Sequence, residues 1–247
     1  MILLILAVAV TRCAKDKEVE GTQEETGTQT AEETVKAETE GQTETIESFN
    51  VYGCELYGVY EYPWNQMSQD WGYEDVEGFY YHEISEECKV EGGSFPVIAQ
   101  VYTYIVCKNA GVDYEVVFAL IEQESRCVWN ANGDSGKSIG LMQVAEKWHK
   151  DRMERLGCAD LTNPYQNIMV GVDFIAELLK EVEQEDKQLQ YADALAAYNY
   201  GMSGAKKHLW DNGIHWYSYN TEIMKRAEEL KQEKVNALEK RGRSVEE

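Results

Sequence analysis

Residues 113–125 read D-Y-E-V-V-F-A-L-I-E-Q-E-S, and this stretch decides the fold of the surrounding chain. Val117, Leu120 and Ile121 repeat at the i, i+3, i+4 spacing of an amphipathic helix, and Asp113 suits its N-cap. The next position on this apolar stripe, i+7, is Glu124. A carboxylate there faces the core, so we expect burial to raise its pKa. A glutamate with a raised pKa is the kind of group that serves as a general acid near neutral pH.

Glu122 lies two residues earlier, on a different face of the same expected helix. Arg126 follows it at i+4, which is the spacing of a surface ion pair along one helix. We therefore interpret Glu122 as a solvated helix charge rather than as part of a site.

The sequence on both sides of this helix predicts a mainly α domain of the α+β kind. Proline or N-capping residues begin the neighbouring segments, and glycines close several of them. A Gly-rich loop is expected over 131–140. The further helices are expected over 95–110, 164–182 and 191–200, and from 221 onward.

The N-terminal third has a different composition. Residues 1–10 form an apolar run, and we expect residues 1–13 to be a secretion signal or a lipoprotein-type anchor with lipid on Cys13. Residues 14–48 are nearly all Glu, Thr, Gln, Gly and Ala, which predicts a disordered acidic linker. Residues 49–94 are rich in Tyr, Trp and Gly, and predict a small segment of short strands and turns.

The composition excludes several classes of function. Lys+Arg is 23 and Asp+Glu is 45, so the net charge is −22, which argues against nucleic-acid binding through phosphates. The four histidines are scattered without metal-ligand spacing, and there is no phosphate-binding loop, so we expect no metal and no cofactor. We expect a monomer that meets a membrane only through its N-terminal anchor.

Six cysteines are present. If Cys13 carries lipid, five remain, and at most two disulfides can form. The connectivity stays open among the others, which are Cys54, Cys88, Cys107, Cys127 and Cys158.

Four short motifs occur in order after the expected helix. Glu124-Ser125 is followed by G-L-M-Q at 140–143, by N-P-Y-Q-N-I at 163–168 with Gly171 just beyond, and by A-Y-N-Y-G at 197–201. This ordered set resembles the lysozyme-like domain of soluble lytic transglycosylases, which cut bacterial peptidoglycan. The resemblance covers about residues 95–220, and residues 221–247 then form a C-terminal helix and charged tail.

The resemblance implies roles for individual residues. Glu124 resembles the catalytic acid, and Ser125 resembles the residue that supports it at the helix end. The other positions resemble groove residues that bind sugar, and they are Met142, Gln143, Tyr198 and Asn199. Residues 163–171 are expected to be scaffold. The implied substrate is the β-1,4 bond between N-acetylmuramic acid and N-acetylglucosamine in peptidoglycan glycan strands, cleaved with formation of a 1,6-anhydro ring.

The loop G-D-S-G-x-x-x-G-L-M-Q also resembles that of goose-type lysozymes, which are hydrolases. Asp134 falls where their loop carries an acidic residue implicated in water activation. Asp134 can be a second carboxylate or only a turn residue, and the composition Asn-Gly-Asp-Ser-Gly favours the turn. The alternatives are therefore an inverting hydrolase that uses Glu124 and Asp134, or a wall-binding scaffold of a secretion or conjugation machine. In every case we expect an exported protein, tethered at the outer face of the bacterial cytoplasmic membrane or in the cell wall.

Overall fold

The computed structural model describes residues 48–51, 54–57 and 76–243. The chain divides into two compact units, Met1–Tyr62 and Pro63–Glu247. In the first unit, strands β1 (Ser48–Val51) and β2 (Cys54–Tyr57) form an antiparallel pair in which Phe49 faces Leu56. The expected anchor over 1–13 and the expected linker over 14–48, apart from Ser48, lie outside the described residues.

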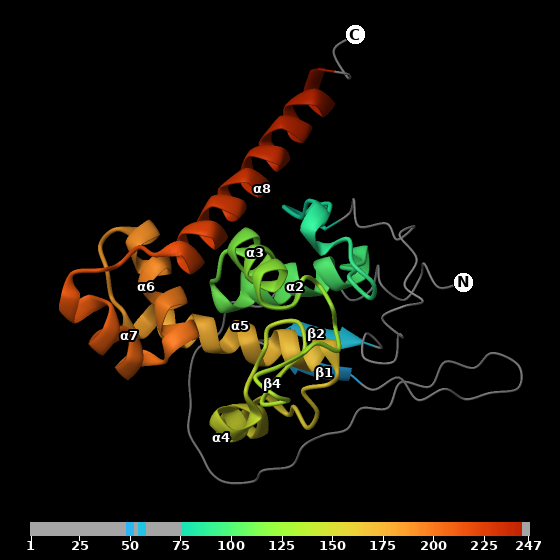
Figure 1. Cartoon of the computed structure of the whole chain (residues 1–247). Coiled ribbons are helices and arrows are strands. Elements are labelled where there is room, and N and C mark those ends of the chain that lie inside the picture. The colour runs from blue at the N-terminus through green and yellow to red at the C-terminus, as the bar shows by residue number, and fades with distance from the viewer. Residues whose placement is uncertain (1–47, 52–53, 58–75, 244–247) are drawn as a thin grey trace, which may run out of the picture. The chain divides into compact units, whose positions relative to one another are not determined.

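The second unit is mainly helical, as predicted (Figure 1). The short hairpin of β3 (Asn132–Gly133) and β4 (Ser138–Ile139) occupies the Gly-rich loop between α3 (Tyr114–Ser125) and α4 (Glu146–Leu156). Along the described residues, no helix combines the length and the apolar character that crossing a bilayer requires. In chain order the elements are η4 (Glu86–Cys88), α2 (Val97–Ala110), α3 (Tyr114–Ser125), β3 (Asn132–Gly133), β4 (Ser138–Ile139), α4 (Glu146–Leu156), α5 (Pro164–Glu181), α6 (Lys187–Tyr200), α7 (Met202–His208), η5 (Trp210–Asn212) and α8 (Ser218–Arg243).

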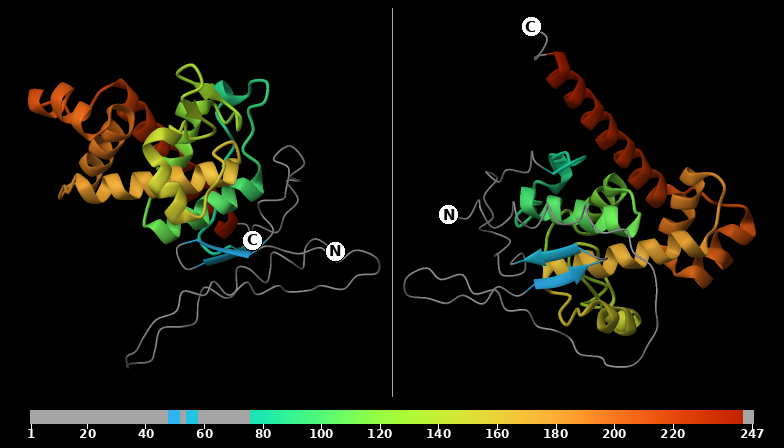
Figure 2. Two further views of the ribbon diagram at one scale, coloured as in Figure 1. Left: turned by 90° about the horizontal axis from the view of Figure 1, so that it is seen from below. Right: turned by 180° about the vertical axis from the view of Figure 1, so that it is seen from behind.

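Helix α3 lies at the centre of the core, in contact with α2 and α8. The stripe residues Val117, Leu120 and Ile121 are fully buried, which confirms the helix and its orientation. Helix α8 covers α3 with Ile223, Ala227 and Leu230. Its C-terminal half extends beyond the other helices of the unit (Figures 1 and 2). The C-terminal helix therefore belongs to the core that carries Glu124, and it begins three residues earlier than expected.

Residues 76–94 also pack on this core. Gln100 of α2 accepts a hydrogen bond from the His82 backbone N–H at 3.0 Å and donates one to the His82 carbonyl at 2.8 Å. His82 itself is fully buried. The aromatic-rich segment thus ends as a wrap over α2 and α3.

Helix α5 begins as the sequence predicts. The Asn163 side chain accepts hydrogen bonds from the backbone N–H groups of Tyr165 and Gln166, and Pro164 occupies the first helical position. One turn further on, the fully buried Asn167 amide bonds the G-L-M-Q segment. It accepts from the Met142 N–H at 2.9 Å and donates to the Ile139 carbonyl at 2.8 Å. The expectation that residues 163–171 are scaffold agrees with these contacts.

The Met142 side chain packs directly against the backbone of α5 at Gly171. A Cβ atom at Gly171 would lie 2.4 Å from the Met142 sulfur and 2.9 Å from its Cβ. Met142 is fully buried and has no room to withdraw. Only glycine permits this approach.

Gly171→Ala is expected to lower the free energy of unfolding by about 1–2 kcal/mol, because overpacking outweighs the gain in helix propensity. Urea unfolding measures the change. Gly204→Ala in α7 is the control for propensity alone, since a Cβ there meets only the Tyr200 side chain, at 3.2 Å. An unchanged stability for Gly171→Ala would show that Met142 can move aside.

Candidate active site

Glu124 lies in the last turn of α3 and is partly buried. Burial raises its pKa, and the nearby Asp134 charge raises it further. The hydroxyl of Tyr219 donates a hydrogen bond to Glu124 Oε1, which favours the charged form and offsets part of the rise. The net direction is upward, as the apolar stripe predicts. This carboxylic acid can hold its proton at a higher pH than an exposed glutamate can.

Tyr219 comes from the first turn of α8, far from Glu124 in the sequence. Burial and the Glu124 carboxylate raise the pKa of its phenol well above the usual value, so the phenol stays protonated and acts as a donor. Sequence reasoning missed this residue. The only signal was the run W-Y-S-Y-N at 216–220, which stands before the last helix and outside the four motifs.

A group of tyrosines surrounds this pair. The Tyr217 ring is stacked with that of Tyr219, with centroids 6.1 Å apart, and meets the ring of Tyr200 at 5.8 Å. The Tyr217 hydroxyl is buried and has no hydrogen-bond partner within the described part of the chain. Burial and the Glu124 charge both raise its pKa. The Tyr217 hydroxyl is thus a buried polar group close to the carboxyl group of Glu124.

Tyr198 comes from α6, and its side chain lies close enough to Glu124 for the two to interact electrostatically. Its hydroxyl donates to the Met142 carbonyl at 2.7 Å, and its ring centroid lies 5.1 Å from that of Phe174. Burial and the Glu124 charge raise the pKa of Tyr198 well above the usual value. This hydroxyl is already engaged, so its role in the structure is to tie α6 to the G-L-M-Q segment. Asn199, the next residue, is exposed.

The G-L-M-Q residues form the supporting layer of the site. The Met142 side chain lies in the core rather than on the surface of a groove, so the expectation that it packs on a sugar is not met. Gln143 adopts a left-handed φ of 47° and donates from Nε2 to the Gly140 carbonyl at 2.9 Å and the Ala131 carbonyl at 3.3 Å. The amide therefore spans the base of the β3–β4 hairpin.

Ser125 is buried and bonds within its own helix. Its hydroxyl donates to the Ile121 carbonyl at 3.1 Å, one turn back. This bond closes the end of α3 beside Glu124. No described contact takes the hydroxyl to the carboxylate itself.

Asp134 is exposed at the tip of the β3–β4 hairpin. Both Asp134 and Ser135 have positive φ, of 48° and 60°, and Gly133 accepts backbone hydrogen bonds from Gly136 and Lys137. These are the features of a tight turn, which aspartate tolerates. The Asp134 charge nevertheless acts on Glu124, as its upward effect on the pKa shows.

Glu122 is not the solvated charge that we expected. It is 7% exposed, and its Oε2 lies 2.8 Å from Arg226 Nε on α8. The expected partner Arg126 is exposed at φ 52°, because α3 ends at Ser125 and the i+4 geometry no longer applies. The interpretation was wrong for this reason, and Glu122 instead joins α3 to α8.

No group of three or more His, Cys, Asp or Glu side chains among the described residues is placed to hold a metal ion. Four of the described cysteines are buried and form no disulfide, and they are Cys88, Cys107, Cys127 and Cys158.

Comparison with known proteins agrees with this arrangement. Residues 105–214 match the family model described as Transglycosylase SLT domain. Lysozyme g of Struthio camelus is 27% identical over 129 residues, which cover 49% of this chain and 60% of that protein. Lysozyme g of Gallus gallus is 25% identical over 125 residues, covering 49% of this chain and 58% of that protein. The chain thus spans somewhat over half the length of the curated relatives that it matches.

Proposed function

We propose, from the SLT, lysozyme-like domain that this chain carries, that the protein cleaves the glycan strands of peptidoglycan. The bond is the β-1,4 link between N-acetylmuramic acid and N-acetylglucosamine. The observation that carries the proposal is the partly buried Glu124, whose pKa is raised and whose carboxyl group accepts the Tyr219 hydrogen bond.

The proposed reaction is that of a lytic transglycosylase. Protonated Glu124 gives its proton to the glycosidic oxygen, and the bond to the anomeric carbon of muramic acid breaks. The resulting carboxylate then takes the proton of the sugar's 6-hydroxyl while that oxygen bonds to the anomeric carbon. The products are a 1,6-anhydro-muramic end and a free N-acetylglucosamine end, and no water is consumed. One carboxyl group performs both steps.

The tyrosines around Glu124 support this cycle. Tyr219 stabilises the carboxylate that forms after the first proton transfer, because it donates to Oε1. Tyr217 stacks on Tyr219 and so helps to hold that ring beside the carboxyl group. Gln143 and Asn199 remain proposed sugar contacts, Gln143 from the hairpin base and Asn199 from its exposed position on α6.

A hydrolase is the second candidate. The Asp134 charge raises the pKa of Glu124, and the curated relatives are named lysozymes. An inverting hydrolase needs a second carboxylate about 6.5–9.5 Å from the first to activate water. Asp134→Asn separates the two reactions. A transglycosylase keeps its rate to within a few fold, whereas a hydrolase that uses Asp134 loses about 10²-fold or more.

Mutations of Asp134 and Tyr219, the two residues that act on the Glu124 pKa, are expected to shift the pH profile of activity in opposite directions. A general acid is lost as the pH rises through its pKa, so activity falls on that limb. Asp134→Asn removes a charge that raises the Glu124 pKa, so the limb moves to lower pH. Tyr219→Phe removes a bond that lowers this pKa, so the limb moves to higher pH. Initial rates of solubilisation of dye-labelled peptidoglycan between pH 4 and 9 give both shifts.

The same profile has a matched control. Tyr104→Phe removes a phenol that bonds to the Glu77 carbonyl on another part of the surface, and it leaves the limb in place. Limbs that move in the same direction for Asp134→Asn and Tyr219→Phe would contradict the assignment of Glu124 as the acid.

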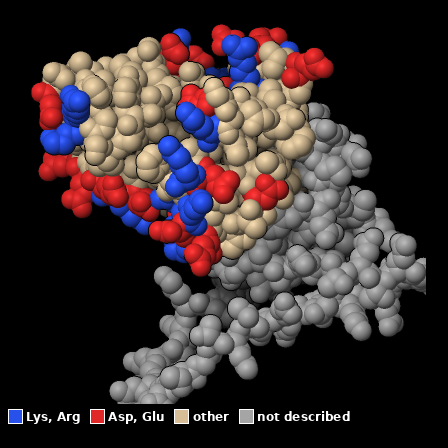
Figure 3. Space-filling model, turned by 60° about the horizontal axis from the view of Figure 1, so that its bottom comes forward, with Lys and Arg blue, Asp and Glu red and all other residues tan. Residues whose placement is uncertain are grey.

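We further propose that the protein acts outside the cytoplasm, tethered through an N-terminal anchor at Cys13. The face in Figure 3 carries acidic and basic side chains interspersed, so it offers no continuous basic patch to attract an anionic wall. A tether raises the local concentration near the wall without such attraction. Radiolabelled palmitate incorporated by wild type and absent from Cys13→Ala tests the anchor. A role within a secretion or conjugation machine would call for the same tether.

A further inference from the structure

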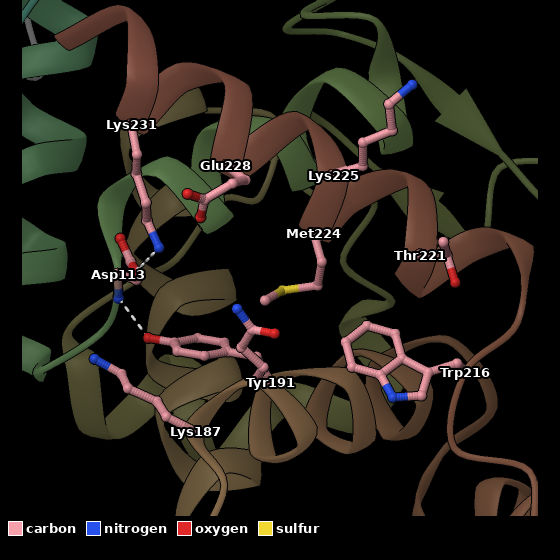
Figure 4. Close-up of a pocket in the computed structure, with 10 residues that line it drawn as sticks. Asp113, Lys187, Tyr191, Trp216, Thr221, Met224, Lys225, Glu228 and Lys231 are labelled. Carbon is pink, nitrogen blue, oxygen red and sulfur yellow. Dashed lines mark hydrogen bonds and ion pairs between the residues drawn. The ribbon is translucent and has the colours of Figure 1, made fainter. Parts of the chain in front are cut away.

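A cavity apart from Glu124 lies in the second unit of the chain, lined by residues of α6, of α8 and of the start of α3. Its volume is about 460 Å³, within the range of small-ligand sites. Helices α3, α6 and α8 all contribute to it, together with the turn before α8 (Figure 4). Its lining residues are Asp113, Lys187, Gln188, Tyr191, Trp216, Thr221, Met224, Lys225, Glu228 and Lys231.

The cavity is separate from the candidate active site. Asp113 marks the N-terminal end of α3 and Glu124 lies in the last turn at the other end, so the two are roughly 16 Å apart along the helix. On α8, the residues Thr221, Met224 and Glu228 share one face at i, i+3, i+7, whereas Tyr219 begins the helix beside Glu124.

One end of the cavity is apolar and aromatic. Trp216 is 43% exposed, and Figure 4 shows its ring, the Met224 side chain and the Tyr191 ring around the central space. Gln188 and Thr221 add an amide and a hydroxyl group to the cavity lining. An exposed indole beside a thioether is a surface that an aliphatic or amide segment of a ligand can cover.

The other end carries balanced charge. Lys231 Nζ lies 2.7 Å from Asp113 Oδ2, so these two neutralise one another. The Asp113 backbone N–H donates to the Tyr191 hydroxyl at 2.7 Å, which fixes the cavity wall. Burial raises the Asp113 pKa, while Lys231 lowers it.

Two opposite charges then remain for a ligand. Lys187 begins α6, and its amine lies 5.9 Å from the Tyr191 ring centroid. Glu228 reaches toward the cavity from α8 (Figure 4). Neither Lys187 nor Glu228 forms an ion pair among the described residues. Figure 4 shows two lysine amines at the rim, that of Lys187 beyond the Tyr191 hydroxyl and that of Lys225 at the opposite side, directed away from the central space.

We propose that this cavity binds a short zwitterionic peptide, with a ligand carboxylate at Lys187 and a ligand ammonium at Glu228 at the charged end, and with the rest of the ligand extending over Met224 toward Trp216. A phosphate polymer fits less well, because the Glu228 carboxylate would repel it and it offers no ammonium group to Glu228. Resting on the proposed function, the peptide is the stem peptide of peptidoglycan, which carries carboxylates and a side-chain amine.

The test measures peptide binding directly and does not need cleavage. The probe is N-acetyl-L-Ala-γ-D-Glu-L-Lys, titrated by calorimetry into the full chain carrying Glu124→Gln. Two capped probes accompany it, one with amidated carboxyl groups and one with an acetylated lysine amine. Both caps are expected to weaken binding by about tenfold, since each removes a charge-assisted hydrogen bond.

Two variants assign the charges to residues. Lys187→Ala is expected to weaken binding about tenfold and to abolish the effect of amidation, while the effect of acetylation remains. Glu228→Gln is expected to do the reverse. Trp216→Ala weakens all three probes alike. Lys150→Ala, an exposed lysine on α4, is the matched control and leaves every constant unchanged.

Several results would overturn the proposal. The proposal is excluded if the Glu124→Gln protein, with its cavity unchanged, shows no saturable binding of the tripeptide at millimolar concentration. It is also excluded if the effects of capping the peptide and of mutating Lys187 or Glu228 are additive. Tighter binding of glycerol phosphate oligomers than of the tripeptide would assign the cavity to an anionic polymer instead. A protein that binds the tripeptide but cleaves no glycan would refute the proposed function and leave the cavity assignment standing.

Discussion

Replacing Glu124 with Gln is expected to reduce the rate of peptidoglycan solubilisation by about 10³-fold or more, since one carboxyl group supplies both the acid and the base. Glutamine keeps the size of the side chain and can still accept the Tyr219 hydrogen bond. It has no proton to give to the glycosidic oxygen. Release of dye from labelled peptidoglycan, at equal protein concentration, measures the loss.

The same variant should not be less stable than wild type. The folded protein raises the Glu124 pKa, so the charged form is disfavoured in the folded state. Glu124 therefore costs no stability at low pH, and the cost develops as the pH rises through the folded pKa. Glu124→Gln removes this cost, and its melting temperature at pH 7 should equal or exceed that of wild type. A lower melting temperature together with lost activity would mean that Glu124 serves the fold instead.

Glu124→Gln also separates an enzyme from a scaffold. An enzyme variant sediments with insoluble peptidoglycan as wild type does and releases nothing from it. If wild type binds and also releases nothing, the protein is a wall-binding component whose Glu124 is idle.

Arg226→Ala is expected to lower the free energy of unfolding by about 3 kcal/mol, the largest stability effect predicted for a single side chain here. Arg226 is the partner of Glu122, whose side chain is 6% exposed, and it also bonds to the Glu83 carbonyl. Without the guanidinium, a carboxylate stays in the core with the Ser85 N–H as its remaining donor. The total free energy of unfolding of a domain is only about 5–15 kcal/mol, so urea unfolding resolves this loss easily.

Two controls isolate the buried charge. Arg226→Met combined with Glu122→Gln should regain most of the loss, because no unpaired charge remains. Lys206→Ala breaks an exposed pair with Asp211, whose side chains are 68% and 53% exposed, and should change stability by less than about 1 kcal/mol. Equal effects for Arg226→Ala and Lys206→Ala would show that Glu122 is well solvated.

The sequence was sufficient to locate Glu124 and the helices around it. The apolar spacing of Val117, Leu120 and Ile121 determines which side of α3 faces the core, and Glu124 follows from that geometry. The Asn163-Pro164 start of α5 is equally local, since its capping bonds reach only two and three residues ahead. Features that depend only on residues within a few positions of one another can be predicted from the local sequence.

The wrong and the missing predictions concern residues whose surroundings are set by contacts with distant parts of the chain. Glu122 was misassigned because its partner lies on α8, 104 residues away, while the local candidate Arg126 stands beyond the end of α3. Tyr219 was missed for the same reason, as it meets Glu124 across 95 residues. Met142 was placed in a groove from its motif, yet a motif does not specify which way a side chain points. Its neighbour Gln143 takes a left-handed φ, and Met142 turns toward Gly171.

The most direct test of the account is mass spectrometry of the soluble fragments that wild type releases from purified peptidoglycan, with Glu124→Gln beside it. The account predicts muropeptides that end in 1,6-anhydro-N-acetylmuramic acid, in the wild-type sample only. Fragments with reducing muramic ends, heavier by one water, would contradict it and would make Asp134 the residue that activates that water.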